Sequence, residues 1–199
     1  MPVQIGAKIH AFTDPTGLLT DCHRRVEMFL GTLEAVANAI DRPATEETSR
    51  ALEGALRYFG EAAPKHTADE EVSLFPRLRQ MNDSEVGPAF ARLDQLEGEH
   101  RWAERLHADV ERLGAQYLSV GSLPNAEVDE FRKDVASLSA MYKRHIGIEE
   151  ELVFPLAARL LSNAEKAAVA EEMANRRKVK LLTDISELRM QVVPAKEVT

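Results

Sequence analysis

Apolar residues recur every three or four positions along most of this chain, which is the spacing of helices with one buried face. The pattern is long and continuous, and we find no strict alternation of apolar and polar residues of the kind typical of strands. The first helix has a clear start at Asp14-Pro15, an N-cap acceptor followed by proline at the first helical position. The sequence therefore predicts an all-α protein.

Turn-forming residues divide this pattern into separate helices. The predicted helices cover about 14–40, 45–76, 84–119, 128–152 and 163–177. Pro64 is expected to kink the second helix, and Asn163 to cap the fifth. Because the connections between the long helices are short, we predict an up-down-up-down four-helix bundle with a short additional C-terminal helix.

The helix boundaries also indicate the domain organisation. We expect an N-terminal arm at 1–13, one bundle domain at 14–177, and a C-terminal extension at 178–199. The extension mixes apolar and charged residues without a clear period, so neither its structure nor its role follows from the sequence.

Composition excludes several classes of protein. The formal net charge is −8, with acidic and basic residues interspersed, whereas nucleic-acid-binding proteins usually present a basic face. No apolar run approaches the ~18 residues of a membrane span, and the N-terminus lacks the apolar core of a signal peptide. Cys22 is the single cysteine, so an internal disulfide is impossible. We expect a cytoplasmic protein that binds neither nucleic acid nor membranes.

Two nearly identical phrases carry the candidate chemistry. One runs from His66 through Glu70 to Phe75-Pro76, and the other from His145 through Glu149 to Phe154-Pro155. In each, a glutamate follows a histidine by four residues, so the two side chains share one helix face. An imidazole and a carboxylate placed side by side can bind a transition metal. Two such pairs suggest a centre with two metal ions.

Several histidines and glutamates lie on the apolar faces themselves, where an unpaired charge costs several kcal/mol. These residues are His23, His66, Glu70, His100, His145 and Glu149. Counting along antiparallel helices at ~1.5 Å per residue places the four histidines in one layer, within roughly 6 Å of a common level. This set suits two first-row transition ions. Each ion would take two histidines and share the glutamates, leaving positions for a small ligand.

This combination of a lone histidine, His-x3-Glu, a second lone histidine and a second His-x3-Glu resembles the hemerythrin-like, or HHE cation-binding, family. The resemblance covers about residues 14–177. It implies a four-helix bundle with a non-haem di-iron centre, bridged by carboxylates and by oxo or hydroxo groups. By motif position it implies six metal ligands. They are His23, His66, Glu70, His100, His145 and Glu149.

The resemblance implies binding or sensing of O2, NO or peroxide, or a role in iron handling. The third helix reads His100-Arg-Trp-Ala-Glu104 and so lacks the His-x3-His pair of the O2-carrying hemerythrins, which argues against reversible O2 carriage. Iron-sulfur repair proteins of this type carry a cysteine-bearing N-terminal segment, and the thirteen residues before Asp14 contain no cysteine.

Other assignments stay open at this point. The centre either binds a gas or oxidant for sensing, storage or detoxification, or it is an enzyme that reduces peroxide or NO; a helical scaffold without metal is the third alternative. Zinc or manganese would also accept these ligands. His107, Glu27 and Glu104 are further candidates, more consistent with supporting roles than with ligation. Glu71 and Glu150 are expected to be ion-paired at the edge of the bundle, and the two Phe-Pro pairs to end their helices.

Overall fold

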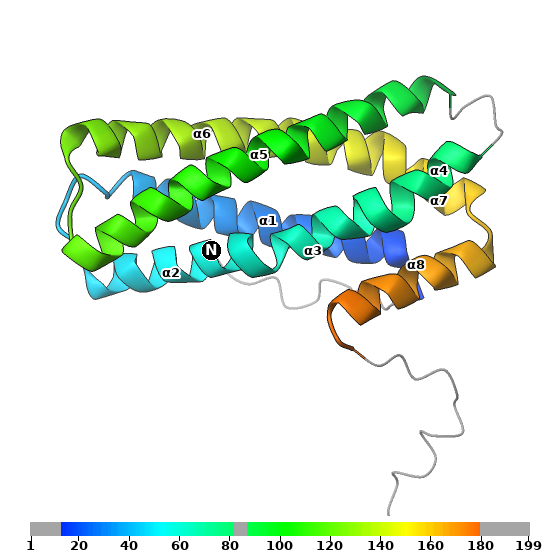
Figure 1. Cartoon of the computed structure of the whole chain (residues 1–199), viewed down its shortest axis with the longest axis horizontal. Helices are drawn as coiled ribbons and strands as arrows, with labels where there is room; N and C mark the ends of the chain where they lie inside the picture. Colours follow the sequence, from blue (N-terminus) through cyan, green and yellow to red (C-terminus); the bar gives the residue numbers. More distant parts are fainter. Residues whose placement is uncertain (1–12, 82–86, 180–199) are drawn as a thin grey trace, which may run out of the picture.

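The computed structural model describes residues 13–81 and 87–179, and these residues form helices and short connections without any strand (Figure 1). The all-α prediction is therefore confirmed. The helical elements are α1 (Pro15–Ala37), α2 (Glu46–Glu61), α3 (Ala63–Ala68), η1 (Asp69–Leu74), α4 (Phe75–Gln80), α5 (Gly87–Val120), α6 (Asn125–Ile148), η2 (Glu149–Val153), α7 (Phe154–Leu160) and α8 (Asn163–Arg176). No helix in the described ranges is both long enough and apolar enough to cross a membrane.

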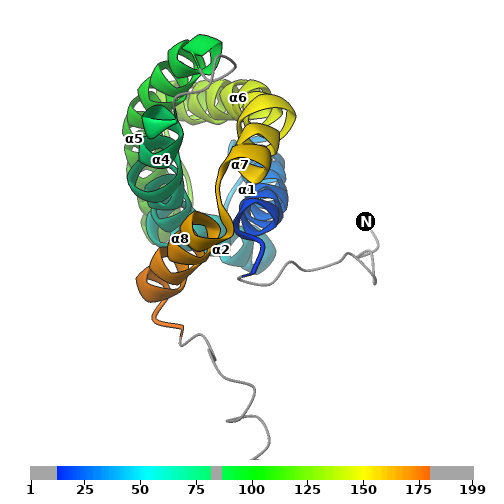
Figure 2. The ribbon, with the colours of Figure 1, turned by 90° about the vertical axis from the view of Figure 1, so that its right-hand side faces the viewer.

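The elements form four long columns that surround a common interior (Figure 2). Two columns are the single helices α1 and α5, while α2 continues through α3 and η1 into α4, and α6 continues through η2 into α7 (Figure 1). Column α1 packs against α2 and α6, and α5 packs against the same two neighbours. The shorter α8 packs against α1 and η1 at one end. Most of the predicted extension lies outside the described residues, as does the expected start of α5 near residue 84.

Pro64 interrupts the second column, as the sequence predicts. Helix α2 ends at Glu61, Ala62 is the residue between the helices, and α3 begins at Ala63 with Pro64 in its first turn. Proline has no N–H to donate to the carbonyl four residues before it, and its ring clashes with that carbonyl. The interruption leads directly into the helix that carries His66.

The prediction that Phe75-Pro76 and Phe154-Pro155 end their helices is wrong. Each column instead widens into a π-helical turn and then resumes as α4 or α7. The Phe75 N–H bonds to the carbonyl of Glu70, and the Phe154 N–H bonds to that of Glu149. Both bonds span five residues, which is the π-helical spacing. Each following proline cannot continue the four-residue ladder, so the wider turn lets the column continue past it.

A polar layer separates two apolar cores inside the columns. On α1, Val26 belongs to the larger core and Leu19 to the smaller one, and His23 lies between them. On the fourth column, Leu138 belongs to the larger core and Val153 to the smaller, with the second His-x3-Glu pair between. The apolar side chains on both sides fix the height of this layer.

The N-cap of helix α8 lies one residue earlier than predicted. It is Ser162, not Asn163, because the Ser162 Oγ accepts a hydrogen bond from the backbone N–H of Glu165. The Glu165 carboxylate in turn accepts one from the Ser162 N–H at 2.8 Å. This reciprocal capping box satisfies two backbone donors that the start of a helix leaves free.

Candidate metal centre

The structure brings all six predicted ligands together in the polar layer. Each of the four columns contributes, and none of the six residues is more than 8% exposed. They are His23 on α1, His66 on α3, Glu70 in η1, His100 on α5, His145 on α6 and Glu149 in η2. Residues far apart in sequence thus form one buried polar cluster.

The cluster divides into two sets of four donors. One set is His23, His66, Glu70 and Glu149, and the other is Glu70, His100, His145 and Glu149. Within each set, one donor atom from every residue lies within 4.8 Å of all the others. Glu70 and Glu149 belong to both sets, so each carboxylate is placed to reach two ions.

The carboxylate oxygens face the imidazole nitrogens without hydrogen-bond geometry, whereas the Nε2 atoms of His100 and His145 lie 3.0 Å apart, at hydrogen-bond distance. The Nε2 of His23 lies 3.1 Å from Glu149 Oε2, and the Nε2 of His100 lies 3.5 Å from Glu70 Oε2. Both carboxylates are fully buried, yet none of their four oxygens has a hydrogen-bond partner among the described residues. Burying such groups is costly unless a cation compensates. The unsatisfied oxygens therefore fit a bound metal pair.

Both candidate bridging glutamates lie in π-helical turns. Glu70 is the second residue of η1, and Glu149 is the first residue of η2. Single π turns inside α-helical columns occur frequently at functional sites. The sequence contained a signal for them, since in both phrases a proline follows the glutamate by six residues.

A family comparison agrees with this geometry. The family model described as "Hemerythrin HHE cation binding domain" matches residues 14–157. The chain belongs to this hemerythrin family. It is also similar to an uncharacterized protein of Haemophilus influenzae, with 29% identity over 171 residues that cover 85% of this chain and 93% of that protein.

Three further carboxylates orient three of the four histidines of this candidate centre from outside. The Nδ1 atoms of His23 and His100 lie 2.9 and 2.8 Å from the carboxylates of Glu150 and Glu71. Such a carboxylate holds the proton on Nδ1 and leaves the Nε2 lone pair for a metal. Glu71 and Glu150 are therefore ion-paired as expected, each with a candidate ligand, and Glu150 also pairs with Arg24.

Glu99 completes this outer set and was missed by the sequence reasoning. Its Oε2 lies 2.9 Å from Nδ1 of His145, while its Oε1 accepts a hydrogen bond from Arg144. Glu99 directly precedes His100 in the chain, yet it contacts His145 on the neighbouring helix α6. His66 differs from the other three, since its Nδ1 has no hydrogen-bond partner among the described residues.

The remaining candidates lie outside both donor sets. Glu27 pairs with Arg24 at 2.6 Å on the exposed side of α1. Glu104 lines a cleft beside the centre. His107 stacks on Phe59 at a centroid distance of 4.4 Å, and its Nε2 lies 3.1 Å from the Tyr142 hydroxyl. Burial lowers the pKa of His107 to about 4, so this imidazole is neutral at pH 7.

The buried charges of the hemerythrin-type centre shift one another strongly. Burial lowers the pKa of His23 and of His145, but the carboxylates beside them outweigh burial and raise these pKa values to about 10 and about 9. Burial and repulsion from Glu149 raise the pKa of Glu70 to about 7. Burial also raises the pKa of Glu149, yet the neighbouring histidines lower it below its ordinary value. Without metal, the site thus holds protons where the cations would bind.

Proposed function

We propose that this chain is a di-iron protein that binds a small oxidant or gas, namely O2, NO or peroxide, for sensing, storage or detoxification. The ligands would be the six residues of the polar layer, held by an up-down-up-down four-helix bundle. One observation carries the proposal: two sets of four buried donors share Glu70 and Glu149. A single ion would need only one such set, whereas two shared carboxylates match a bridged pair.

The donor count leaves room for an external ligand. Each set offers two imidazoles and two carboxylates, and an open coordination position is what lets a metal centre take up a small molecule. A small void of about 10 Å³ is lined by the four histidines together with Tyr142. A void of this size accommodates about one water-sized molecule. Bound iron would supply electron exchange with a ligand placed there.

The residues of the chain then perform three tasks. Glu70 and Glu149 neutralise positive charge inside an otherwise apolar interior. Glu150, Glu71 and Glu99 fix the rings of His23, His100 and His145 and, once metal is bound, would hold the single proton of each ring on Nδ1. The two apolar cores exclude bulk water from the layer, which strengthens the electrostatic interactions within it.

Metal content and an optical spectrum test this proposal. Protein expressed with iron should carry two iron ions per chain, and the aerobic spectrum should show absorption bands of an oxo-bridged ferric pair that disappear with reductant. Zinc gives no such bands, and manganese would be identified by elemental analysis. Protein from metal-replete medium that holds no transition metal would contradict the proposal and favour a metal-free helical scaffold.

The enzyme alternative has support of its own. A cleft of about 430 Å³ lies beside the centre and is lined in part by His100, and gas binding alone does not require so large a space. Steady consumption of peroxide or NO by iron-loaded protein with an electron donor would identify an enzyme. Stoichiometric binding without turnover would identify a binding module. Iron handling and iron-sulfur repair would instead require release of iron to an acceptor.

A further inference from the structure

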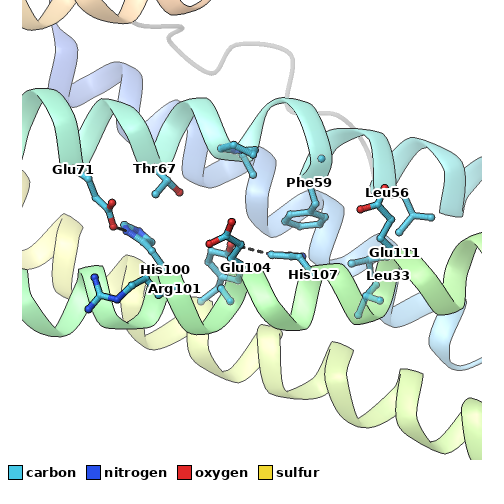
Figure 3. Close-up of a pocket in the computed structure, with 17 residues that line it drawn as sticks. Leu33, Leu56, Phe59, Thr67, Glu71, His100, Arg101, Glu104, His107 and Glu111 are labelled. Carbon is cyan, nitrogen blue, oxygen red and sulfur yellow. Dashed lines mark hydrogen bonds and ion pairs between the residues drawn. The ribbon is translucent and has the colours of Figure 1, made fainter.

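The cleft beside the centre lies between the second column and α5, and apolar side chains line it with glutamates at intervals along its length (Figure 3). Glu71 and His100 mark the end near the metal ligands, while Leu33 and Leu56 lie at the opposite end (Figure 3). Phe59 and His107 line the middle. The cleft is therefore an elongated, largely apolar space that ends at a candidate metal ligand.

The cleft adjoins the small void among the four histidines. Both spaces share the lining residues Ala63, Thr67, His100 and Tyr142. The void measures about 10 Å³ and the cleft about 430 Å³. A molecule that fills both must have a very small head at the centre and a much larger body behind it.

The size of the cleft points to an organic body. Small-molecule sites usually measure roughly 300–1,000 Å³, and a water molecule takes a share of only ~30 Å³ in the liquid. O2, NO and hydrogen peroxide are far smaller than a space of about 430 Å³. The cleft would leave such ligands surrounded by unfilled volume.

The charges along the cleft disfavour an anionic molecule, and the apolar side chains between them favour an uncharged body. Glu71, Glu104 and Glu111 line it, against the single cationic side chain Arg101 (Figure 3). His107 is neutral because burial lowers its pKa to about 4. An anionic ligand such as a fatty acid would face like charges, whereas an uncharged apolar body would contact Leu33, Leu56 and Phe59 (Figure 3).

We propose that the cleft binds a neutral organic hydroperoxide, with its O–O group at the metal centre and its alkyl or aryl body between the second column and α5. This inference rests on the proposed function, since it names the substrate class of the same centre. Bound iron, if reduced to the diferrous state, would supply the two electrons that cleavage of the O–O bond requires, and solvent would supply two protons. The products would be one alcohol and one water, with both ions left ferric.

Gly60 provides a way to block the cleft without disturbing the metal ligands. It lines the cleft on α2, and a Cβ atom added there meets no atom within 4 Å. Phenylalanine also has a higher helix propensity than glycine, so Gly60→Phe is expected to fold. Gly54 is the matched control, because it lies on the same helix with equally open space but does not line the cleft.

Binding is tested first in an NMR titration of zinc-loaded protein with 2-phenyl-2-propanol, the stable alcohol product of cumene hydroperoxide. The wild type and Gly54→Phe should bind saturably with similar affinity, and Gly60→Phe should bind about tenfold more weakly or not at all. Reaction is tested next, by mixing reduced iron-loaded protein with cumene hydroperoxide or hydrogen peroxide in a single turnover. Gly60→Phe should slow the cumene hydroperoxide reaction about tenfold and leave the hydrogen peroxide rate unchanged.

The outcomes separate this inference from the proposed function. If the protein holds iron and reacts with hydrogen peroxide, but 2-phenyl-2-propanol does not bind saturably, the hydroperoxide inference is overturned and the proposed function stands. Equal effects of Gly60→Phe and Gly54→Phe would also overturn it, since the cleft would then not matter. A protein that binds no transition metal would overturn both.

Discussion

The Nδ1 of His145 on α6 lies 2.9 Å from Oε2 of Glu99 on α5, although the two residues are 46 positions apart in the chain. With a metal ion bound, the imidazole would be neutral and would have one proton; this contact assigns that proton to Nδ1 and leaves the Nε2 lone pair for the ion. Glu99 therefore contributes to the candidate centre without facing a metal ion.

We predict that Glu99→Gln lowers metal affinity by about 10–100-fold while the protein still folds, because a neutral amide holds the imidazole less firmly and makes it less basic. Competition with a chromophoric chelator would measure the change. Glu97→Gln is the control, since Glu97 lies on the same helix and pairs with Arg79 at 2.5 Å, away from the histidines. Equal affinity of wild type and Glu99→Gln would contradict the orienting role.

The two shared carboxylates should couple metal binding to stability. We predict that Glu149→Ala removes most of the stabilisation that metal gives the wild type, since the residue belongs to both donor sets. A metal present at 1,000 times its Kd stabilises the native state by about 4 kcal/mol. The measurement is the difference in unfolding free energy with metal and with chelator. A variant that retains the full wild-type difference would argue against Glu149 as a ligand.

The buried carboxylate of Asp69 connects α8 to the π turn that holds Glu70. Asp69 is fully buried and accepts hydrogen bonds from Arg176 at 2.8 Å and Arg177 at 2.6 Å. We predict that Asp69→Ala destabilises the protein by about 2–3 kcal/mol. This is less than the usual cost of breaking a buried ion pair, because water can hydrate the two partly exposed arginines once the carboxylate is gone. Denaturant unfolding would measure this.

Glu172→Gln serves as the comparison for Asp69. This substitution weakens the ion pair between Glu172 and Arg77, whose side chains are 38% and 22% exposed, respectively. The expected loss of unfolding free energy is therefore below about 1 kcal/mol. If Asp69→Ala also costs less than that, α8 is not anchored through this carboxylate.

Stability should depend on pH in opposite directions with and without metal. In the metal-free protein the pKa values of His23 and His145 are raised to about 10 and about 9, so the folded state holds extra protons. Their contribution is fully present below the ordinary histidine pKa and is lost as pH rises through about 9–10. With metal bound the ligands must be deprotonated, so stability falls as pH is lowered.

Thermal unfolding in chelator and in excess metal, at several pH values between about 5.5 and 10, would test this contrast. Parallel pH profiles in the two conditions would mean that metal does not replace protons at these histidines.

The sequence alone determined the all-α class and the identity of the candidate ligands. Apolar periodicity sets which face of a helix is buried, and the His-x3-Glu spacing brings two donors onto that face whatever the rest of the protein does. His66 with Glu70, and His145 with Glu149, were therefore predictable as pairs. Their convergence with His23 and His100 followed from helix lengths, because short connections fix the relative height of neighbouring helices.

Only the tertiary structure decided how the candidate ligands are supported. The partners of His23 and His145 are Glu150, 127 positions away, and Glu99, 46 positions away. Such pairings depend on the rotation of one helix against another, which local spacing does not encode. The π turns at Glu70 and Glu149 were likewise not predictable from local spacing. A helix that meets a proline can either end there or continue through a wider, π-helical turn. The buried continuation of each column into the second apolar core favoured widening, because Phe75 and Phe154 lose contact with water there.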